Sequence, residues 1–145
     1  MGDIKRASLD WQGEGLAFKG TLGSGYTFDL VNPAGEAGGS PMEFLLAGVA
    51  GCTAMDVIHI LRKKRLNVHG FTVEIVGERA EAHPKVYTNV EITFVVRGED
   101  IQPRDVAEAI RLSKDKYCSA SAMFVRAGAE VHTSYRIEAP DAASE

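Results

Sequence analysis

The sequence has 145 residues, close to the roughly 150 residues of one typical domain. Hydrophobic residues make up 45% and charged residues 25%, a composition that excludes a disordered, collagen-like or low-complexity chain. Its 16 basic and 20 acidic residues give a net charge of −4. That mild acidity argues against a nucleic-acid-binding face that covers the whole domain.

The two cysteines are too few for the disulfide framework of a small secreted protein. The first residues lack the apolar core of a signal peptide, and no run of about 18 apolar residues occurs in the chain. We therefore expect a cytoplasmic protein with no nucleic-acid partner and no membrane partner. In that compartment thiols are kept reduced unless chemistry oxidises them.

Before residue 31, apolar residues alternate with polar ones in three short stretches that glycines separate. This period of two is typical of half-buried β-strands and predicts a three-stranded meander. The alternating apolar residues are Ala7, Leu9 and Trp11, then Leu16 and Phe18, then Tyr26, Phe28 and Leu30.

A long helix is expected to begin after Ser40. Ser40 and Glu43 have the spacing of a capping box, in which each side chain binds the backbone amide of the other residue. Residues 44–61 are almost all apolar or small, a pattern that predicts a buried central helix. The four cations at 62–65 complement the helix dipole at its C-terminus, and Asn67 is a plausible left-handed cap.

The rest of the chain predicts two strands, two helices and a last strand. The strands are expected at 71–76 and 90–96, a helix from Pro103 to Cys118, a short helix at 119–126, and the last strand at 131–137. The element order is then βββ-α-ββ-αα-β, an α+β arrangement. We expect one domain over residues 1–138 and a loose tail over residues 139–145.

Cys52 and Cys118 are the residues that invite a chemical explanation. Cys52 lies about three turns into the long helix, where Gly48 and Gly51 allow a backbone or a ligand to approach its sulfur closely. Cys118 lies at a helix break, where neighbouring lysines and the start of a short helix should favour its thiolate. If the two sulfurs meet, one can attack an oxidant and the other can resolve the sulfenic acid as a disulfide.

The four histidines show no paired spacing typical of a metal site. His59 follows Cys52 on the same helix with Asp56 between them, which suggests a Cys/His couple. The two turns between Cys52 and His59 rise about 10 Å, however, which is too far for a direct hydrogen bond.

Two segments of the chain resemble motifs of the OsmC/Ohr superfamily. Residues 40–54, SPMEFLLAGVAGCTA, resemble its central-helix motif, and residues 116–121, KYCSAS, resemble its second-cysteine motif. The segments 77–79 and 83–88 are similar to the YhfA-like branch, and the resemblance extends from Gly15 to Glu138. It implies an OsmC-like fold with antiparallel sheets wrapped around a long central helix, and two chains intertwined as a homodimer.

The resemblance also implies a reaction. Better-characterised members reduce organic hydroperoxides and hydrogen peroxide in oxidative-stress defence, with no cofactor and no metal. Cys52 would then attack the peroxide, Cys118 would resolve it as a disulfide, and a dithiol reductant would restore both thiols.

This sequence departs from the pattern of the family's peroxidases at the groups that polarise the thiolate. Met42 stands where those peroxidases have a glutamate. The carboxylate of Glu43 lies nine residues before Cys52, which is about 900° of helix rotation and about 13 Å of rise, on the opposite face. Neither Arg6 nor Lys19 fits the pattern of the family's arginine.

Three interpretations follow from these residues. The first is a thiol-dependent peroxidase that uses Cys52 and Cys118. The second is a non-enzymatic dimeric module that binds a small apolar ligand beside Cys52. The third is a thiolate metal site, for which two cysteines from one chain leave the coordination incomplete unless two subunits share ligands.

Overall fold

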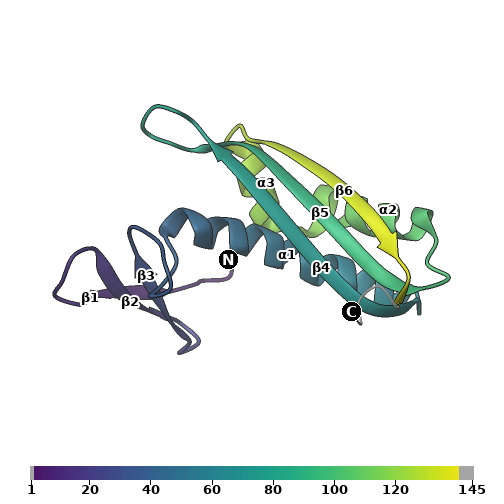
Figure 1. The fold of residues 1–145 in the computed structure, drawn as a ribbon, viewed down its shortest axis with the longest axis horizontal. Helices are drawn as coiled ribbons and strands as arrows, with labels where there is room; N and C mark the ends of the chain where they lie inside the picture. The colour runs from purple at the N-terminus through teal and green to yellow at the C-terminus, as the bar shows by residue number, and fades with distance from the viewer. Residues whose placement is uncertain (1, 141–145) are drawn as a thin grey trace. The chain divides into compact units, whose positions relative to one another are not determined.

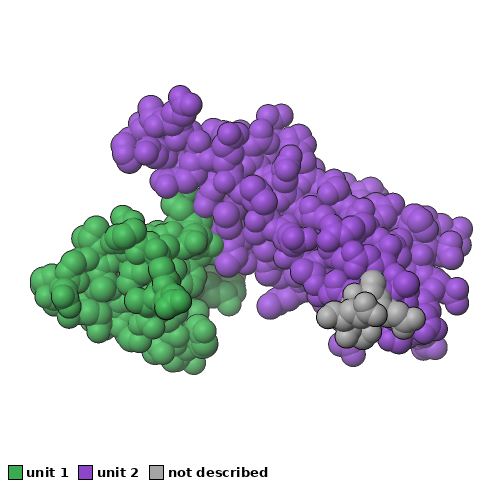
Figure 2. Space-filling view, viewed as in Figure 1, with its two compact units in different colours: residues 1–45 green, residues 46–145 purple. Residues whose placement is uncertain are grey.

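The computed structural model describes residues 2–140 of the chain. Its backbone divides into two compact units, residues 1–45 and residues 46–145, which Figure 2 colours separately. Most of the expected tail, residues 141–145, lies outside the described residues. That residues 1–138 form one domain stays a prediction.

The N-terminal unit holds the expected three-stranded meander. Its strands are β1 (Ala7–Trp11), β2 (Ala17–Leu22) and β3 (Thr27–Val31). They pair antiparallel in the order β1-β2-β3. The ring of Phe28 lies so close to Gly20 that a Cβ at this position would overlap it, which explains the glycine in the middle of a strand.

The long helix α1 (Pro41–Lys63) begins where the sequence predicts. The backbone N–H of Ser40 donates to Oε1 of Glu43 at 2.9 Å, and the backbone N–H of Glu43 donates to Oγ of Ser40 at 3.4 Å. These two bonds form the predicted capping box and satisfy amides that the helix itself leaves free.

The end of α1 differs from the sequence expectation. The left-handed residue is Arg65, with φ 60°, and not Asn67. The N–H of Leu66 donates to the carbonyl of Leu61 at 3.3 Å, and the N–H of Arg65 donates to that of Arg62 at 2.9 Å. This pair of bonds is a Schellman motif, which closes the helix two residues earlier than the asparagine would.

The C-terminal unit contains a three-stranded sheet in the order β4-β5-β6. The strands are β4 (Asn67–Arg79), β5 (Tyr87–Glu99) and β6 (Glu130–Glu138), and the segments between β5 and β6 are α2 (Pro103–Leu112), the π-helical turn η1 (Ser113–Tyr117) and α3 (Ser119–Arg126). The observed order therefore confirms the predicted βββ-α-ββ-αα-β.

One part of the predicted fold is wrong, because this second sheet is not wholly antiparallel. Strands β4 and β5 pair antiparallel, but β5 and β6 run parallel. A parallel partner requires a crossover connection of a dozen or more residues, and the helical segments between β5 and β6 provide it. Figure 1 shows α2, α3 and the later part of α1 behind the sheet.

The core of the C-terminal unit lies between the sheet and these helices. The central strand β5 supplies its largest group of buried side chains, because it has a neighbour on both edges. The buried hydrophobic residues that pack together are Val49, Val57 and Leu61 of α1, Val90, Ile92, Phe94 and Val96 of β5, Ile101, Val106, Ala109 and Ile110 around α2, and Val131 of β6.

The prediction that α1 is buried all round is wrong for the single chain. Its buried residues recur every fourth position, namely Val49, Thr53, Val57 and Leu61. This spacing gives one stripe along the helix, and Met55 on another face is 73% exposed. The chain supplies cover for one face only, so the remaining apolar surface of α1 is open.

α1 is also the helix that passes a simple test for a membrane span. By length and composition it is long and apolar enough to cross a bilayer, although it contains no unbroken apolar run of that length. The core helix of a soluble protein passes the same test. The absence of a membrane partner therefore stays a prediction.

An ion-pair group attaches the end of α1 to α2. Nζ of Lys64 lies 2.8 Å from Oε1 of Glu108 and 3.4 Å from Oδ1 of Asp105. The hydrogen bond with Glu108 raises the pKa of Lys64, and the same bond lowers the pKa of Glu108. One of the four cations at this helix end thus has specific partners besides the helix dipole.

The burial of Phe94 leads to a stability prediction. Phe94 is fully buried in the centre of β5, so we expect Phe94→Ala to lower the free energy of unfolding by about 3–5 kcal/mol. As the matched control, Val76→Ala removes an apolar side chain that is 67% exposed on β4 and should change it by less than about 0.5 kcal/mol. Urea unfolding followed by circular dichroism measures both, and equal effects would contradict the proposed core.

Candidate functional site

The helix α1 supplies one half of the candidate site. Cys52 is a free thiol and is half-buried. Asp56 follows it by one helical turn, and residues four apart lie on the same helix face. Thr53 is adjacent and belongs to the buried stripe of the helix. Cys52 therefore lies at the border between the packed face of α1 and its open surface.

Cys118 supplies the other half, at the junction of η1 and α3. It ends the π-helical turn and is the N-cap of α3, with an extended backbone at φ −78° and ψ 98°. The backbone N–H of Ser121 donates to its Sγ at 3.3 Å, and Oγ of Ser121 donates to its carbonyl at 3.2 Å. The thiol thus occupies the place that a capping hydroxyl or carboxylate usually takes.

The structure brings the two predicted residues together, 66 positions apart in sequence. The sulfurs of Cys52 and Cys118 and a carboxylate oxygen of Asp56 all lie within 4.8 Å of one another. Both cysteines are unbonded thiols. A disulfide has an S–S length of about 2.05 Å, so closing the pair needs movement of about 3 Å or less.

A buried chain of hydroxyls holds Asp56 in this position. Oγ of Ser113 donates to Oδ2 of Asp56 at 2.9 Å and lies 2.8 Å from Oγ1 of Thr53. Because Ser113 has one hydroxyl proton and gives it to the carboxylate, Thr53 is the donor in the second bond. The chain connects α1 with the first residue of η1, which is the turn that leads to Cys118.

Sequence reasoning missed the roles of Thr53 and Ser113 and did not place Asp56 beside both cysteines. A signal for Ser113 was present, because this hydroxyl stands on the apolar face of the predicted second helix, and it is completely buried. The π-helical turn carried no comparable signal. Such turns occur frequently at functional sites, but their sequences resemble those of α-helices.

The prediction for the ionisation of Cys118 is wrong. The sequence places this thiol at a helix start near lysines, which should favour the thiolate, but the side chain is only 3% exposed. Burial raises the pKa of Cys118 above its usual value, and the contact with Cys52 acts in the same direction. The hydrogen bonds from Ser121 lower it but do not reverse the shift. Burial therefore keeps Cys118 in the thiol form over a wider pH range.

The other candidate residues stay outside this cluster. His59 lines a pocket of about 220 Å³ together with Asp56, Ile60, Lys63 and Tyr117, but it is not among the clustered ligand atoms. Glu43 is engaged in its capping box. Lys19 forms an ion pair with Asp29 at 2.6 Å.

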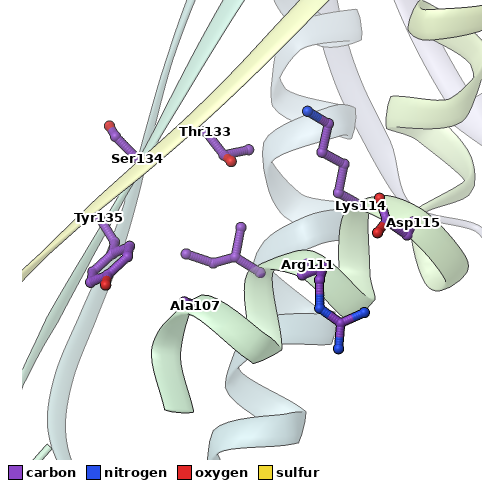
Figure 3. Close-up of a pocket in the computed structure, with 8 residues that line it drawn as sticks. Ala107, Arg111, Lys114, Asp115, Thr133, Ser134 and Tyr135 are labelled. Atoms are coloured by element: carbon purple, nitrogen blue, oxygen red, sulfur yellow. The ribbon is translucent and has the colours of Figure 1, made fainter. Parts of the chain in front are cut away.

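A larger cavity, of about 450 Å³, lies between α2, η1 and β6 (Figure 3). Thr133, Ser134 and Tyr135 project from β6, and Lys114 reaches toward this strand, where it donates to the carbonyl of Val131 at 2.8 Å. Neither cysteine lines this cavity. This cavity is therefore separate from the candidate site at the two thiols.

The chain matches one protein-family model and is similar to a curated protein over nearly its full length. The family model of OsmC-like protein matches residues 34–134, which include both cysteines. Over 134 residues the chain is 37% identical to Protein YhfA of Escherichia coli, and the match covers 92% of this chain and 98% of that protein.

Solved structures show the same likeness. A hypothetical protein from Aquifex aeolicus has a TM-score of 0.84 at 31% identity, covering 95% of this chain and 98% of that chain. The organic hydroperoxide resistance protein OhrB of Bacillus subtilis has a TM-score of 0.62 at 19% identity, covering 92% and 98%. At that identity the second match shows a common fold alone.

The difference in burial between the thiols leads to a prediction for alkylation. We expect iodoacetamide at neutral pH to modify Cys52 well before Cys118, because the thiolate is the reactive form and burial both covers Cys118 and raises its pKa. The pH at which the rate at Cys118 reaches half its maximum should lie above about 8.5, the pKa of an ordinary thiol. Peptide mass spectrometry over time measures both rates, and equal rates at neutral pH would contradict this account.

Proposed function

Since this chain belongs to the OsmC-like protein family, we propose that it is a cysteine-based redox protein that reduces organic hydroperoxides or hydrogen peroxide with Cys52 and Cys118. The observation that carries the proposal is the proximity of two free thiols on separate elements of the fold. The likeness to OhrB supports it, because that protein is named for resistance to organic hydroperoxides.

The two cysteines take different roles in the proposed reaction. Cys52 is half-buried, so its thiolate attacks the outer oxygen of the hydroperoxide. The O–O bond breaks, Cys52 becomes a sulfenic acid, and an alcohol leaves after taking up a proton. Cys118, which is almost fully buried, then attacks the sulfur of Cys52. Its proton joins the sulfenic hydroxyl as water while the disulfide forms.

A dithiol reductant completes the cycle by thiol–disulfide exchange, so no cofactor enters the proposed reaction. This requires a reducing compartment, and we place the protein in the cytoplasm for that reason. The proposal includes departures from the family's peroxidases, since no residue matches their arginine and their glutamate is also replaced. Met42 replaces their glutamate, and the carboxylate that stands beside the sulfurs here is Asp56.

We also propose that two chains form a homodimer. The N-terminal unit has no buried hydrophobic side chain among its described residues 2–45, and Trp11 on β1 is 60% exposed. A unit of this size rarely folds without oligomerisation or another staple. The exposed apolar side of α1, with Met55 on it, offers further surface for a second copy.

The second candidate function is a dimeric module that binds a small apolar ligand beside Cys52. One observation favours it: a Cβ added to Gly48 or Gly51 would meet nothing within 4 Å. The helix therefore has open space next to this thiol, into which a ligand fits as well as a neighbouring chain. Peroxide turnover no faster than that of a free thiol, together with ligand-dependent melting, would select this function.

The reaction predicts a specific covalent product. One equivalent of an organic hydroperoxide added to the reduced protein should produce a disulfide between Cys52 and Cys118 in most molecules, because the sulfurs are already close. Cys52→Ser should abolish the reaction, whereas Cys118→Ser should stop it at the sulfenic acid of Cys52. Peptide mass spectrometry with a sulfenic-acid trap distinguishes the products, and absence of the disulfide in the unsubstituted protein would reject the peroxidase.

The homodimer predicts a mass and a way to disrupt it. Light scattering after size-exclusion chromatography should give twice the 15.6 kDa chain mass. Met55→Glu should shift the protein toward monomer, because it places a charge on the exposed apolar side of α1. The matched control Gln102→Glu adds the same side chain at an exposed, uncharged polar position and should remain dimeric. A monomer for the unsubstituted chain would contradict the dimer.

A further inference from the structure

We propose that the reduced chain binds a thiophilic divalent cation of the Zn²⁺ class through Cys52, Asp56 and Cys118. The three side chains place two sulfurs and a carboxylate oxygen within 4.8 Å of one another. Around Zn²⁺, with metal–sulfur and metal–oxygen distances of about 2.3 Å and 2.1 Å, ligand atoms lie about 3.4–3.8 Å apart. Small side-chain rotations therefore suffice to close the site.

The donor set fits this class of cation. Thiolate sulfur selects zinc and other soft or borderline metals over magnesium and calcium, which prefer oxygen. Three protein ligands leave the fourth tetrahedral position for water. Sequence reasoning judged two cysteines insufficient for a metal within one chain, and Asp56 is the third ligand that this reasoning lacked.

The charges of the three ligands themselves also favour a cation. When both thiols ionise, the site carries two thiolates and the carboxylate of Asp56. Among residues 2–140, Asp56 takes part in no ion pair and is held by the hydroxyl of Ser113 alone. Close like charges in a partly buried place are unfavourable unless an opposite charge compensates them, and a divalent cation does so.

The groups behind the three ligands have the arrangement of a metal's outer shell. Ser113 binds one oxygen of Asp56, which leaves the second oxygen for the cation, and Thr53 in turn binds Ser113. The backbone N–H of Ser121 points at the sulfur of Cys118. Outer-shell hydrogen bonds of this kind orient metal ligands. Because Thr53 and Ser113 are buried, water does not compete for them.

Two hollows at the surface are each lined by one residue of the cluster. The pocket of about 220 Å³ is lined by Asp56, and a second pocket of about 290 Å³ is lined by Cys118 together with Met123 and Arg126. Each is large enough for a hydrated cation to approach, since one water takes about 30 Å³.

Metal binding and the proposed peroxidase exclude each other at the same sulfurs, although the metal site does not rest on peroxidase activity. Binding releases both thiol protons to solvent and leaves no free thiolate at Cys52. Oxidation of the thiolates by a hydroperoxide, with two protons taken up, gives the disulfide, an alcohol and water, and releases the cation. The bound cation therefore protects the thiols from peroxide and leaves when they are oxidised.

The experiment uses the untagged, full-length chain, reduced and stripped of metal with a chelator. Zn²⁺ is titrated in competition with a chromophoric chelator, and native mass spectrometry counts the ions. We expect one Zn²⁺ per chain. The binding constant should fall at least about tenfold in Asp56→Asn and about 10–100-fold in Ser113→Ala, which keeps all three ligands but removes the hydrogen bonds to Asp56 and Thr53. As the matched control, Asp115→Asn changes an exposed carboxylate of η1 and should bind like the unsubstituted chain.

Three results would overturn the proposal: no stoichiometric Zn²⁺, equal binding by Asp56→Asn, or equal binding by the protein whose cysteines are joined in a disulfide. The disulfide form needs no substitution, so it keeps the test valid if a variant fails to fold. Disulfide formation by hydroperoxide in the metal-free protein is measured separately. If it occurs without zinc binding, this inference fails and the proposed function stands, and the opposite pair of results reverses that conclusion.

Discussion

The arrangement of this protein's cysteines depends on a buried chain of hydrogen bonds from Thr53 through Ser113 to Asp56. It connects α1 with the start of η1, two elements separated by the whole β4–β5 hairpin. If Ser113 lost its hydroxyl, the buried partners would be left unsatisfied, at a cost of about 1–3 kcal/mol. These hydrogen bonds therefore attach η1, the turn that leads to Cys118, to the helix that carries Cys52.

The site combines a buried thiol with a more accessible one, and burial decides what each can do. At Cys118, desolvation outweighs the hydrogen bonds from Ser121, so this residue stays a thiol. Cys52 lies where the packed stripe of α1 meets its open surface. One thiol is thus partly accessible while the other is buried nearby, an arrangement that suits the proposed peroxidatic and resolving pair.

The charged group that lies beside the two sulfurs is a carboxylate, and it bears on both proposals. The carboxylate beside the sulfurs belongs to Asp56, four residues after Cys52, and the residue at the family's glutamate position is Met42. The carboxylate of Asp56 makes it less favourable for the neighbouring thiols to ionise, whereas a bound cation would stabilise the thiolates. The proposed peroxidase and the proposed metal site therefore use the same two reduced sulfurs, and a bound cation excludes the reaction with peroxide.

Much of this fold was predictable from sequence, because local patterns determine its elements. The capping box at Ser40 and Glu43 and the alternation in the strands place the elements correctly. The parallel pairing of β5 and β6 was not predicted, since it depends on how the helices cross the sheet. The exposure of α1 was also missed, because hydrophobic patterning does not say which molecule covers a face.

Within the candidate site, sequence motifs singled out Cys52 and Cys118, which the structure brings together, but not the three polar residues beside them. Asp56 and Thr53 look like ordinary residues of a long helix, and their meeting with Ser113 depends on contacts across about sixty residues of chain. The effect of burial on Cys118 had the same origin, because helix position alone predicted the opposite shift of its pKa. Contacts between residues far apart in sequence therefore decide which polar groups lie beside the cysteines and in which direction the pKa of Cys118 shifts.

The central claim is that Cys52 and Cys118 act as one redox couple. Equilibrating the metal-free protein in a series of glutathione redox buffers, followed by acid quenching and mass spectrometry, tests it most directly. The account predicts that one intramolecular disulfide between Cys52 and Cys118 appears in a single two-electron transition. A chain that instead accumulates glutathione on Cys52, with Cys118 still free, would contradict it.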